Sequence, residues 1–169
     1  MALTAKAFLG MSQQELDDMF RASEVGPIPS GDAVGTAIVK PGTALADIAA
    51  PVVSGLAWQG KVFDPTSGTL RNKITPLGMK EIVAKVYIAP SWFDGRDCVV
   101  LDYSDTSFVA HSVRDEIREV SPGLYLGIVF ISRKKTINFA LQFGGGSETT
   151  SLWRRVKASL STLLGRLKR

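Results

Sequence analysis

Apolar and polar residues alternate with a period of two through most of the chain after Trp58, and turn-forming residues separate the alternating segments. Alternation of this kind is typical of strands with one buried face, and its return about every 10 to 15 residues is typical of antiparallel strands with short connections. Together with an earlier apolar segment, the pattern predicts eight strands, at residues 34–40, 58–64, 69–75, 82–89, 97–103, 114–120, 124–132 and 136–143. We therefore expect an all-β fold with minor α content, built as an antiparallel barrel of about eight strands.

Three other segments follow a helical pattern. Ser12 and Glu15 have the spacing of a capping box and precede an apolar face, which predicts a short N-terminal helix that ends near Ala22. Residues 43–56 keep helical spacing but contain a proline, so we expect a kinked helix there. In residues 106–113 the pattern is mixed, and we expect a short helical turn before the next strand.

The residues after the last predicted strand change character twice. Residues 144–147 read Gly-Gly-Gly-Ser, which is typical of a flexible linker and also resembles an engineered one. Residues 152–169 place their leucines on one helical stripe with the basic side chains largely away from it, which predicts a basic amphipathic helix. The chain therefore divides into an N-terminal helix with a turn-rich segment (1–33), the barrel (34–143), a linker (144–151) and the basic helix (152–169).

The positive charge of the chain is concentrated in this last helix. The chain has 20 Lys and Arg against 16 Asp and Glu, a formal net charge of +4. Residues 147–169 hold six of the basic residues and only Glu148, so residues 1–146 hold the other 14 basic and 15 acidic residues. A surface that binds nucleic acid needs its basic excess spread over the domain, and few aromatic residues accompany the basic ones in the tail. We expect no nucleic-acid partner.

The basic helix is the strongest indication of a partner in the sequence. A stripe of leucines beside six cations can lie in a membrane interface, where burial of the stripe and attraction to anionic lipids act together. The alternative is that the leucines pack on the protein's own barrel or on a second copy of the chain. The residues expected to contact an anionic membrane surface are Trp153, Arg154, Arg155, Lys157, Leu160, Leu164 and Leu167.

Few residues of the chain can support catalysis or metal binding. Cys98 is the only cysteine and His111 the only histidine, which excludes a disulfide within the chain, a cysteine-based zinc site and a site with several histidines. Cys98 lies in an apolar segment that suits a packed thiol, and His111 has no recognisable partner to orient it as a base or a haem ligand. We expect no catalytic residue, no metal and no cofactor.

The sequence also suggests where the protein resides. The first ten residues lack the apolar region of a secretory signal, and no window approaches 18 consecutive apolar residues. A single unpaired cysteine fits a compartment that keeps thiols reduced. We expect a cytoplasmic protein that is peripheral to the membrane through its tail.

One predicted strand has alternating charges. Two sets of side chains face opposite ways on it: Arg114, Glu116 and Arg118 on one face, and Asp115, Ile117 and Glu119 on the other. The first set can form ion pairs on a solvent-exposed face. Alternatively, Arg114 or Arg118 points into the barrel and holds a carboxylate or phosphate head group through two hydrogen bonds.

Several short motifs resemble those of known families. They are residues 58–63 (WQGKVF), 70–74 (LRNKI), 91–96 (SWFDGR), 101–104 (LDYS) and 122–127 (PGLYLG). The motifs look like those of a group of uncharacterised bacterial proteins with a calycin-like, or lipocalin-like, barrel, and more loosely like the family with a Gly-x-Trp-x-Gly motif. The similarity covers about residues 12–143, and Leu56 stands where the second family has its first glycine. The resemblance implies a barrel that binds a small molecule, and it implies no catalytic residue.

The expected function is non-catalytic binding or carrying of a small hydrophobic or amphipathic ligand inside the barrel, at an anionic membrane surface that supplies such ligands. The residues expected to bind the ligand are Trp58, Trp92, Tyr103, Arg118 and Tyr125. One alternative is an isomerase- or cyclase-type enzyme on a hydrophobic substrate, which needs a buried acid or base such as His111 or a carboxylate. The other is an interaction module with a solid barrel.

Overall fold

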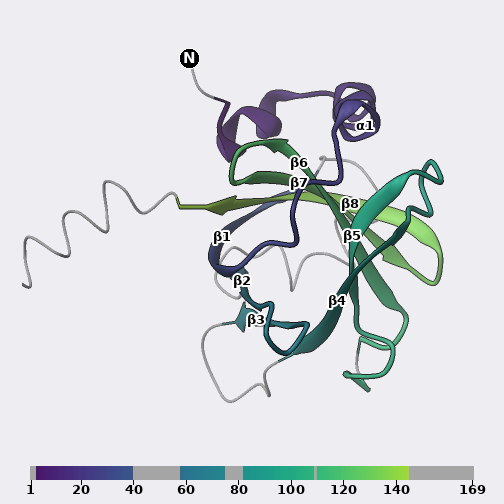
Figure 1. Ribbon diagram of the computed structural model, residues 1–169. Coiled ribbons are helices and arrows are strands. Elements are labelled where there is room, and N and C mark those ends of the chain that lie inside the picture. Colours follow the sequence, from purple (N-terminus) through teal and green to yellow (C-terminus); the bar gives the residue numbers. More distant parts are fainter. Residues whose placement is uncertain (1–2, 40–57, 75–81, 109, 145–169) are drawn as a thin grey trace, which may run out of the picture.

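The structure is a computed structural model that describes residues 3–39, 58–74, 82–108 and 110–144. These residues form a 3-10 helix, η1 (Ala5–Gly10), an α-helix, α1 (Gln13–Ala22), and eight strands (Figure 1). The strands are β1 (Gly31–Ile38), β2 (Trp58–Asp64), β3 (Thr69–Ile74), β4 (Val83–Pro90), β5 (Asp97–Asp102), β6 (Val113–Ser121), β7 (Leu124–Ile131) and β8 (Lys134–Phe143).

The eight strands pair in chain order and close into an antiparallel barrel. Each strand pairs with the next one along the chain, and β8 returns to pair with β1, where Ala33 lies opposite Phe143. This arrangement confirms the predicted all-β barrel of about eight strands. The bounds differ most in β1, which begins at Gly31 rather than at Val34 because Gly31 already pairs with Phe63 of β2.

Helix α1 begins where the sequence predicts it. Ser12 Oγ accepts a hydrogen bond from the Glu15 backbone N–H at 3.2 Å, and the Glu15 carboxylate accepts one from the Ser12 N–H at 2.6 Å. Both halves of the capping box are therefore present, and the helix ends at Ala22 as expected. The sequence did not indicate η1, because a six-residue 3-10 helix is too short to show a helical period.

The two helices cover part of the outer face of the barrel. Phe8 of η1 and Leu16 and Phe20 of α1 are fully buried against side chains that point outward from the strands, such as Cys98 and Leu126. Figure 1 shows both helices at the top of the view, above the strands. The N-terminal segment therefore shares a hydrophobic core with the barrel.

The inner face of the barrel forms a second hydrophobic core. Its buried members are Ala33, Phe63, Leu70, Ala84, Val86, Val99, Leu101, Tyr103, Ile117, Tyr125, Phe139 and Leu141. Gly127 leaves room for the ring of Phe139 on the neighbouring strand, since a Cβ at position 127 would lie 2.3 Å from that ring. Aromatic side chains thus fill space that glycine provides.

Three predicted segments lie wholly or mostly outside the described residues: the kinked helix at 43–56, the linker at 144–151 and the basic helix at 152–169. In residues 106–113, the expected helical turn takes the form of single hydrogen-bonded turns, and the Val113 N–H donates to the Ala110 carbonyl at 2.9 Å. Over the described part of the chain, no helix has the length and apolar character needed to cross a membrane.

Candidate functional site

Four polar side chains lie on the inner face of the barrel among apolar residues. They are Lys61 of β2, Asn72 of β3, Tyr103 directly after β5, and Asp115 of β6, and we call them the interior polar cluster. Each lies two residues from an apolar member of the inner core: Lys61 from Phe63, Asn72 from Leu70, Tyr103 from Leu101 and Asp115 from Ile117. Lys61, Tyr103 and Asp115 are each only 3% exposed and are shielded from water, whereas Asn72 is half-buried.

Lys61 lies at the centre of the interior polar cluster. Its Nζ donates to Asn72 Oδ1 at 2.8 Å, to Tyr103 Oη at 2.6 Å and to Asp115 Oδ2 at 3.0 Å. The contact with Asp115 is an ion pair. Three aromatic rings have their centroids 5.3 to 5.6 Å from Nζ, within the range of cation–π attraction: Trp58, Tyr103 and Phe139. These contacts compensate for removing an ammonium group from water.

Further hydrogen bonds connect the members of the cluster, and one of its oxygen atoms has no partner among the described residues. Tyr103 Oη donates to Asp115 Oδ2 at 3.1 Å and accepts from Asn72 Nδ2 at 3.1 Å. Asn72 Nδ2 also donates to the Ile82 carbonyl at 3.1 Å, and Asn72 Oδ1 accepts from Trp58 Nε1 at 3.3 Å. The other carboxylate oxygen, Asp115 Oδ1, is buried and has no hydrogen-bond partner among the described residues. A buried acceptor without a donor is destabilising, so this oxygen is the atom of the cluster that can accept a further hydrogen bond.

Burial and neighbouring charge set the protonation of the cluster. Burial by itself lowers the pKa of Lys61, but the charge of Asp115 and the hydrogen bonds to Tyr103 and Asp115 outweigh it, so the pKa is raised above its usual value. Burial, together with the charge of Asp115, raises the pKa of Tyr103 to about 12. At neutral pH the cluster therefore combines a charged ammonium group with a neutral phenol that keeps its proton for donation.

The interior polar cluster lies toward one end of the barrel, which we call the Lys61 end. At this end β1, β3, β5 and β7 finish and the other four strands begin. Half-buried apolar side chains from the inner face lie at the same end, and we call them the apolar rim: Trp58, Ile82, Ala110, Val113 and Val129. Buried polar groups beside an apolar rim offer both kinds of contact that an amphipathic ligand needs.

A β-bulge brings Trp58 and Lys61 to the same face of β2. The pairing of β2 with β3 shifts register between Trp58 and Gly60, so two residues that are three positions apart both point inward. Gly60 adopts a φ of 132°, and a Cβ there would lie 2.0 Å from the Ala33 carbonyl oxygen. Only glycine fits this position, and it places the indole ring of Trp58 next to the ammonium group.

Of the five residues expected to bind a ligand, the structure brings two together. Tyr103 belongs to the interior polar cluster, and Trp58 donates to it and forms part of the apolar rim. Tyr125 also points into the barrel but lies at the opposite end, four residues or about 13 Å along β7 from Val129. There Tyr125 Oη donates to the Pro27 carbonyl at 2.8 Å and holds the segment that follows α1.

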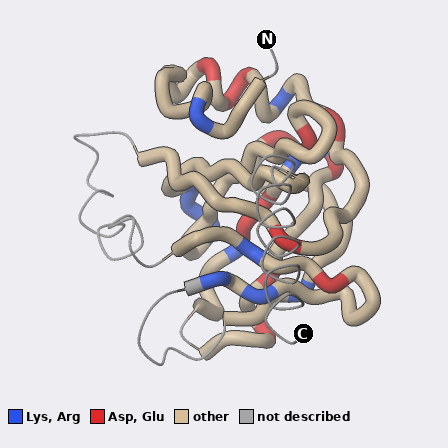
Figure 2. Tube along the Cα trace, turned by 90° about the vertical axis from the view of Figure 1, so that its left-hand side faces the viewer, with Lys and Arg blue, Asp and Glu red and all other residues tan. Residues whose placement is uncertain are grey.

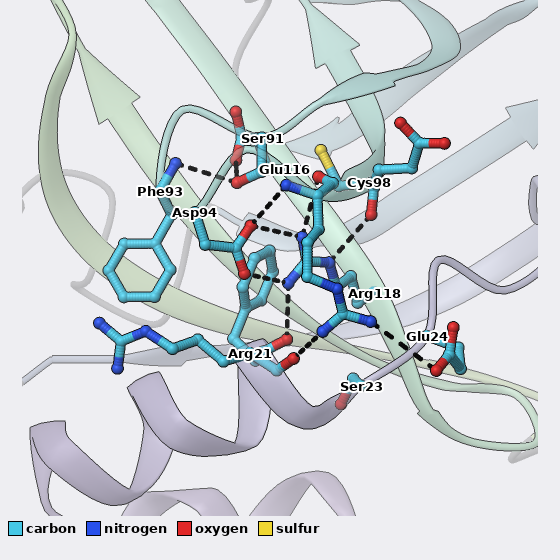
Figure 3. Close-up of polar contacts among 12 residues, drawn as sticks. Arg21, Ser23, Glu24, Ser91, Phe93, Asp94, Cys98, Glu116 and Arg118 are labelled. Atoms are coloured by element: carbon cyan, nitrogen blue, oxygen red, sulfur yellow. Dashed lines mark hydrogen bonds and ion pairs between the residues drawn. The ribbon is translucent and has the colours of Figure 1, made fainter.

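Arg118 lies on the outer face of β6, against the carboxyl end of α1 (Figure 3). It makes two hydrogen bonds to the Asp94 carboxylate, at 2.6 and 2.7 Å. Its other three N–H groups donate to backbone carbonyls at 2.9 to 3.0 Å, those of Phe20, Arg96 and Asp97. All five N–H groups are thus used outside the barrel, and Arg118 does not point into it.

The charged side chains of β6 lie on the two faces that the sequence predicts, but the face of Glu116 and Arg118 is buried and not exposed to solvent. Asp115 and Ile117 point inward, and Glu116 and Arg118 point outward. The expectation of a solvent-exposed outer face is wrong, because Glu116 and Arg118 are both 0% exposed. Helix α1 and the loop of residues 91–96 cover this face through the hydrogen bonds of both side chains.

Trp92 lies on the outer surface, away from the interior polar cluster. The guanidinium groups of Arg114 and Arg133 lie 4.4 and 4.7 Å from its ring centroid, and the ring of Phe130 meets it edge-on at 5.6 Å. Glu116 accepts hydrogen bonds from the Trp92 backbone N–H at 2.8 Å and from Arg114 Nε at 2.9 Å. These contacts fix the loop of Trp92 on β6 and β7.

Charged residues on the outer surface mostly lie near opposite charges. Figure 2 shows acidic and basic positions interspersed along the chain. The exposed and half-exposed ion pairs include Arg21–Asp18, Lys73–Asp32, Lys85–Asp105, Arg96–Glu24 and Lys135–Asp17. Pairs of this kind contribute little to stability, and they cancel much of the local field that would attract a charged partner.

His111 and Cys98 lie outside the interior polar cluster. His111 is exposed, and its Nδ1 lies 2.9 Å from the Phe108 carbonyl oxygen. Cys98 is buried in the outer core, and burial raises the pKa of its thiol to about 12. In the part of the chain that the structure describes, no three His, Cys, Asp or Glu side chains are placed to hold a metal ion.

Sequence reasoning did not select Lys61, Asn72 and Asp115 as site residues. The signal that could have found them is a polar side chain on the apolar face of a strand, since each alternates with buried apolar residues. That signal was weak because the bulge at Gly60 disturbs the alternation of β2, and because charges on both faces of β6 obscured which face was buried.

Comparison with known proteins supports the fold. The chain matches no model of a known protein family, and comparison with curated proteins gives no match. It is similar to a solved structure described as the crystal structure of a protein from Thermomonospora curvata, with 18% sequence identity and a TM-score of 0.56. The match covers 78% of this chain and 87% of that one. At this identity the likeness shows a shared barrel fold, while the calycin resemblance of the sequence motifs stays a prediction.

Proposed function

We propose that the barrel binds a small amphipathic molecule at its Lys61 end. The proposal rests on Asp115 Oδ1, a buried carboxylate oxygen without a hydrogen-bond partner among the described residues. A bound molecule would supply the missing contact with its polar group and cover the apolar rim with its apolar part. An eight-stranded barrel is compatible with such a role.

Native mass spectrometry of the gently purified full-length protein tests the proposal directly. We expect an additional mass of a few hundred daltons per chain that organic solvent extracts and that fragmentation identifies. A protein that shows only its sequence mass, and that takes up no amphipathic probe afterwards, would contradict ligand binding and favour a solid barrel.

A matched pair of substitutions locates the bound molecule. Val113→Trp adds a large ring to the apolar rim, whereas Val62→Trp adds the same ring to the outer face of β2, where Val62 is 37% exposed. We expect Val113→Trp to lower ligand occupancy at least several-fold and Val62→Trp to leave it unchanged, with melting temperatures compared for both. Equal occupancy in the two variants would place the ligand elsewhere.

The basic tail supports a second part of the proposal, attachment to an anionic membrane surface. The support is the sequence alone, in which six cations accompany a stripe of leucines in residues 152–169. Full-length protein is expected to sediment with vesicles that contain phosphatidylserine and not with phosphatidylcholine vesicles. Removal of residues 147–169 is expected to abolish sedimentation, and retained binding by the shortened protein would exclude this role of the tail.

Proton-transfer catalysis is the second candidate, and the same oxygen favours it. A buried carboxylate oxygen with no donor can act as a general base toward a C–H or O–H group of a bound substrate. Incubation of the extracted molecule with protein in D₂O tests this idea by mass spectrometry. Deuterium incorporated into a C–H position by the wild-type protein, and not by Asp115→Asn, would support an enzyme, whereas no incorporation would leave binding alone.

A further inference from the structure

We propose that the head group bound at the Lys61 end is a neutral hydrogen-bond donor, a hydroxyl or amide N–H group on an apolar body, which donates to Asp115 Oδ1. The inference rests on the proposed function, because it names the class of ligand that the same site accepts. It follows from which hydrogen-bonding groups of the interior polar cluster are already used.

Every donor of the cluster has an acceptor within the protein. The three N–H groups of Lys61 go to Asn72, Tyr103 and Asp115. The hydroxyl of Tyr103 donates to Asp115 Oδ2, and the two N–H groups of Asn72 go to Tyr103 and to the Ile82 carbonyl. Counted over the residues that the structure describes, the cluster therefore has no free donor to offer to a carbonyl, carboxylate or phosphate, and its unsatisfied atom, Asp115 Oδ1, is an acceptor.

The charge of the cluster points to a neutral head group. Lys61 and Asp115 form a buried ion pair, with side chains 4% and 5% exposed, so the cluster is electrically balanced before a ligand arrives. An anionic head group would bring a second negative charge next to Asp115 Oδ1 without any free donor to bind it. A cationic head group would leave a net positive charge in a site shielded from water. A hydroxyl or amide group satisfies the oxygen without changing the charge.

This class of ligand differs from the one expected from an arginine inside the barrel. Two hydrogen bonds from Arg118 would suit a carboxylate or phosphate, but its five N–H groups are used on the outer face. The polar end of the barrel interior is therefore an acceptor site instead of an anion site. The apolar rim beside it suits the body of a long-chain or cyclic alcohol or amide.

Four head groups, compared on alkyl chains of equal length, test the inference on the full-length protein. They are an alcohol, its methyl ether, a carboxylate and an ammonium ion, each on octyl, decyl and dodecyl chains. Each compound is titrated by calorimetry at neutral pH, the two ions below their micelle concentrations and the alcohol and ether below their solubility limits. The ether keeps the oxygen and the apolar chain of the alcohol but cannot donate. Because hydrogen bonds to charged groups are among the stronger ones, we expect the alcohol to bind about tenfold or more tightly than the other three.

The results separate this inference from the proposed function. Equal affinity of alcohol and ether would overturn the donor requirement, and tighter binding of the carboxylate or the ammonium ion would overturn the neutral head group, while ligand binding itself would stand in both cases. If no probe binds and the purified protein holds no extractable molecule, the proposed function fails, and with it the inference. Preference for the alcohol supports both.

A substitution at the acceptor gives an independent measurement. In Asp115→Asn the position of Oδ1 is taken either by an amide N–H group, which cannot accept, or by an uncharged carbonyl oxygen, which is a weaker acceptor. We therefore expect the preference for alcohol over ether to fall to about twofold or less. Asp102→Asn is the matched control, because Asp102 lies on the outer face of β5 and accepts from Tyr87 Oη at 2.7 Å. Retention of the alcohol preference in a folded Asp115→Asn protein would overturn the assignment to this oxygen. If that variant does not fold, the wild-type probe series decides.

Discussion

At the scale of single residues, the buried ion pair of Lys61 and Asp115 sets the energetics of the interior. Removing one partner of such a pair leaves the other charge without compensation, which costs about 3–5 kcal/mol, whereas replacing both by apolar residues is often close to neutral. The cost arises from desolvation of the charge that stays behind. The pair therefore couples two strands that are not neighbours in the sheet, β2 and β6.

A double-mutant cycle measures this coupling. We expect Lys61→Met and Asp115→Leu each to lower the free energy of unfolding by about 3–5 kcal/mol. The loss in the double variant is expected to be smaller than the sum of the two single losses. Urea denaturation of the four proteins at neutral pH gives the values. Strictly additive losses would show that the two side chains do not interact.

Alkaline pH probes the same residues through their protons. Burial raises the pKa of Tyr103 from 10.0 to about 12, and the pKa of Lys61 is also raised. Between pH 10 and 12 the unfolded chain loses protons that the folded protein keeps. The contribution of these two groups to the free energy of unfolding is therefore fully present below pH 10, and it is lost as the pH rises through this window. In Tyr103→Phe, we expect the fall with pH to be shallower by up to about 1.4 kcal/mol per pH unit.

The measurement is the urea midpoint at pH 8, 10 and 11 for the wild-type protein and Tyr103→Phe. The variant also loses the hydrogen bonds of its hydroxyl, so it is expected to be less stable already at pH 8, and only the slope against pH tests the titration. Identical slopes would show that Tyr103 titrates at the same pH in the folded and unfolded states.

At the scale of elements, Arg118 fastens α1 to the barrel. It donates to the Phe20 carbonyl in the last turn of the helix and pairs with Asp94 in the loop between β4 and β5. A cation at the carboxyl end of a helix also interacts favourably with the helix dipole. Helix, loop and strand are thus connected through one fully buried guanidinium group.

We expect Arg118→Met to destabilise the protein by about 3–5 kcal/mol, because it removes five hydrogen bonds and the positive charge that pairs with the Asp94 carboxylate. Hydrogen–deuterium exchange should show the largest increase in α1 and in residues 91–96. Arg21→Met is the control, since Arg21 forms an exposed pair with Asp18 and its loss should cost less than about 1 kcal/mol. Exchange that rises equally throughout the barrel would contradict a local role for Arg118.

The elements themselves were predictable from the sequence to different degrees. Seven of the eight strands lie within two residues of their predicted bounds, because alternation and turn residues are local signals. The burial of Glu116 and Arg118 was not predictable in this way, since it depends on α1, about 100 residues earlier in the chain. The interior polar cluster likewise joins side chains from four separate parts of the chain, and only the closure of the barrel brings them together.

At the scale of the whole molecule, the barrel depends on its N-terminal helices. Phe8, Leu16 and Phe20 are fully buried on its outer face, and burial of one such side chain contributes about 1.5–3 kcal/mol. The summed contribution of the three side chains is therefore comparable to the free energy of unfolding of an ordinary domain, about 5–15 kcal/mol.

Two truncations test this dependence. We expect removal of residues 1–22 to abolish cooperative unfolding or to cause aggregation, whereas removal of residues 147–169 should leave the melting temperature unchanged. Thermal unfolding followed by circular dichroism gives both results. A cooperative transition in the protein without residues 1–22 would show that the barrel folds without its outer helical layer.

The pairing of β1 with β8 also determines where the protein is best attached to a surface or to a fused domain. Gly31 and Phe143 both lie at the end of the barrel opposite the Lys61 end, so the chain enters β1 and leaves β8 there. A sensor surface, affinity resin or fused domain attached at Gly144 is therefore tethered on the far side from the interior polar cluster. Immobilisation at Gly144 therefore leaves the attachment point at the opposite end of the barrel from Lys61, while a tether introduced in the turn between β7 and β8 would lie at the Lys61 end itself.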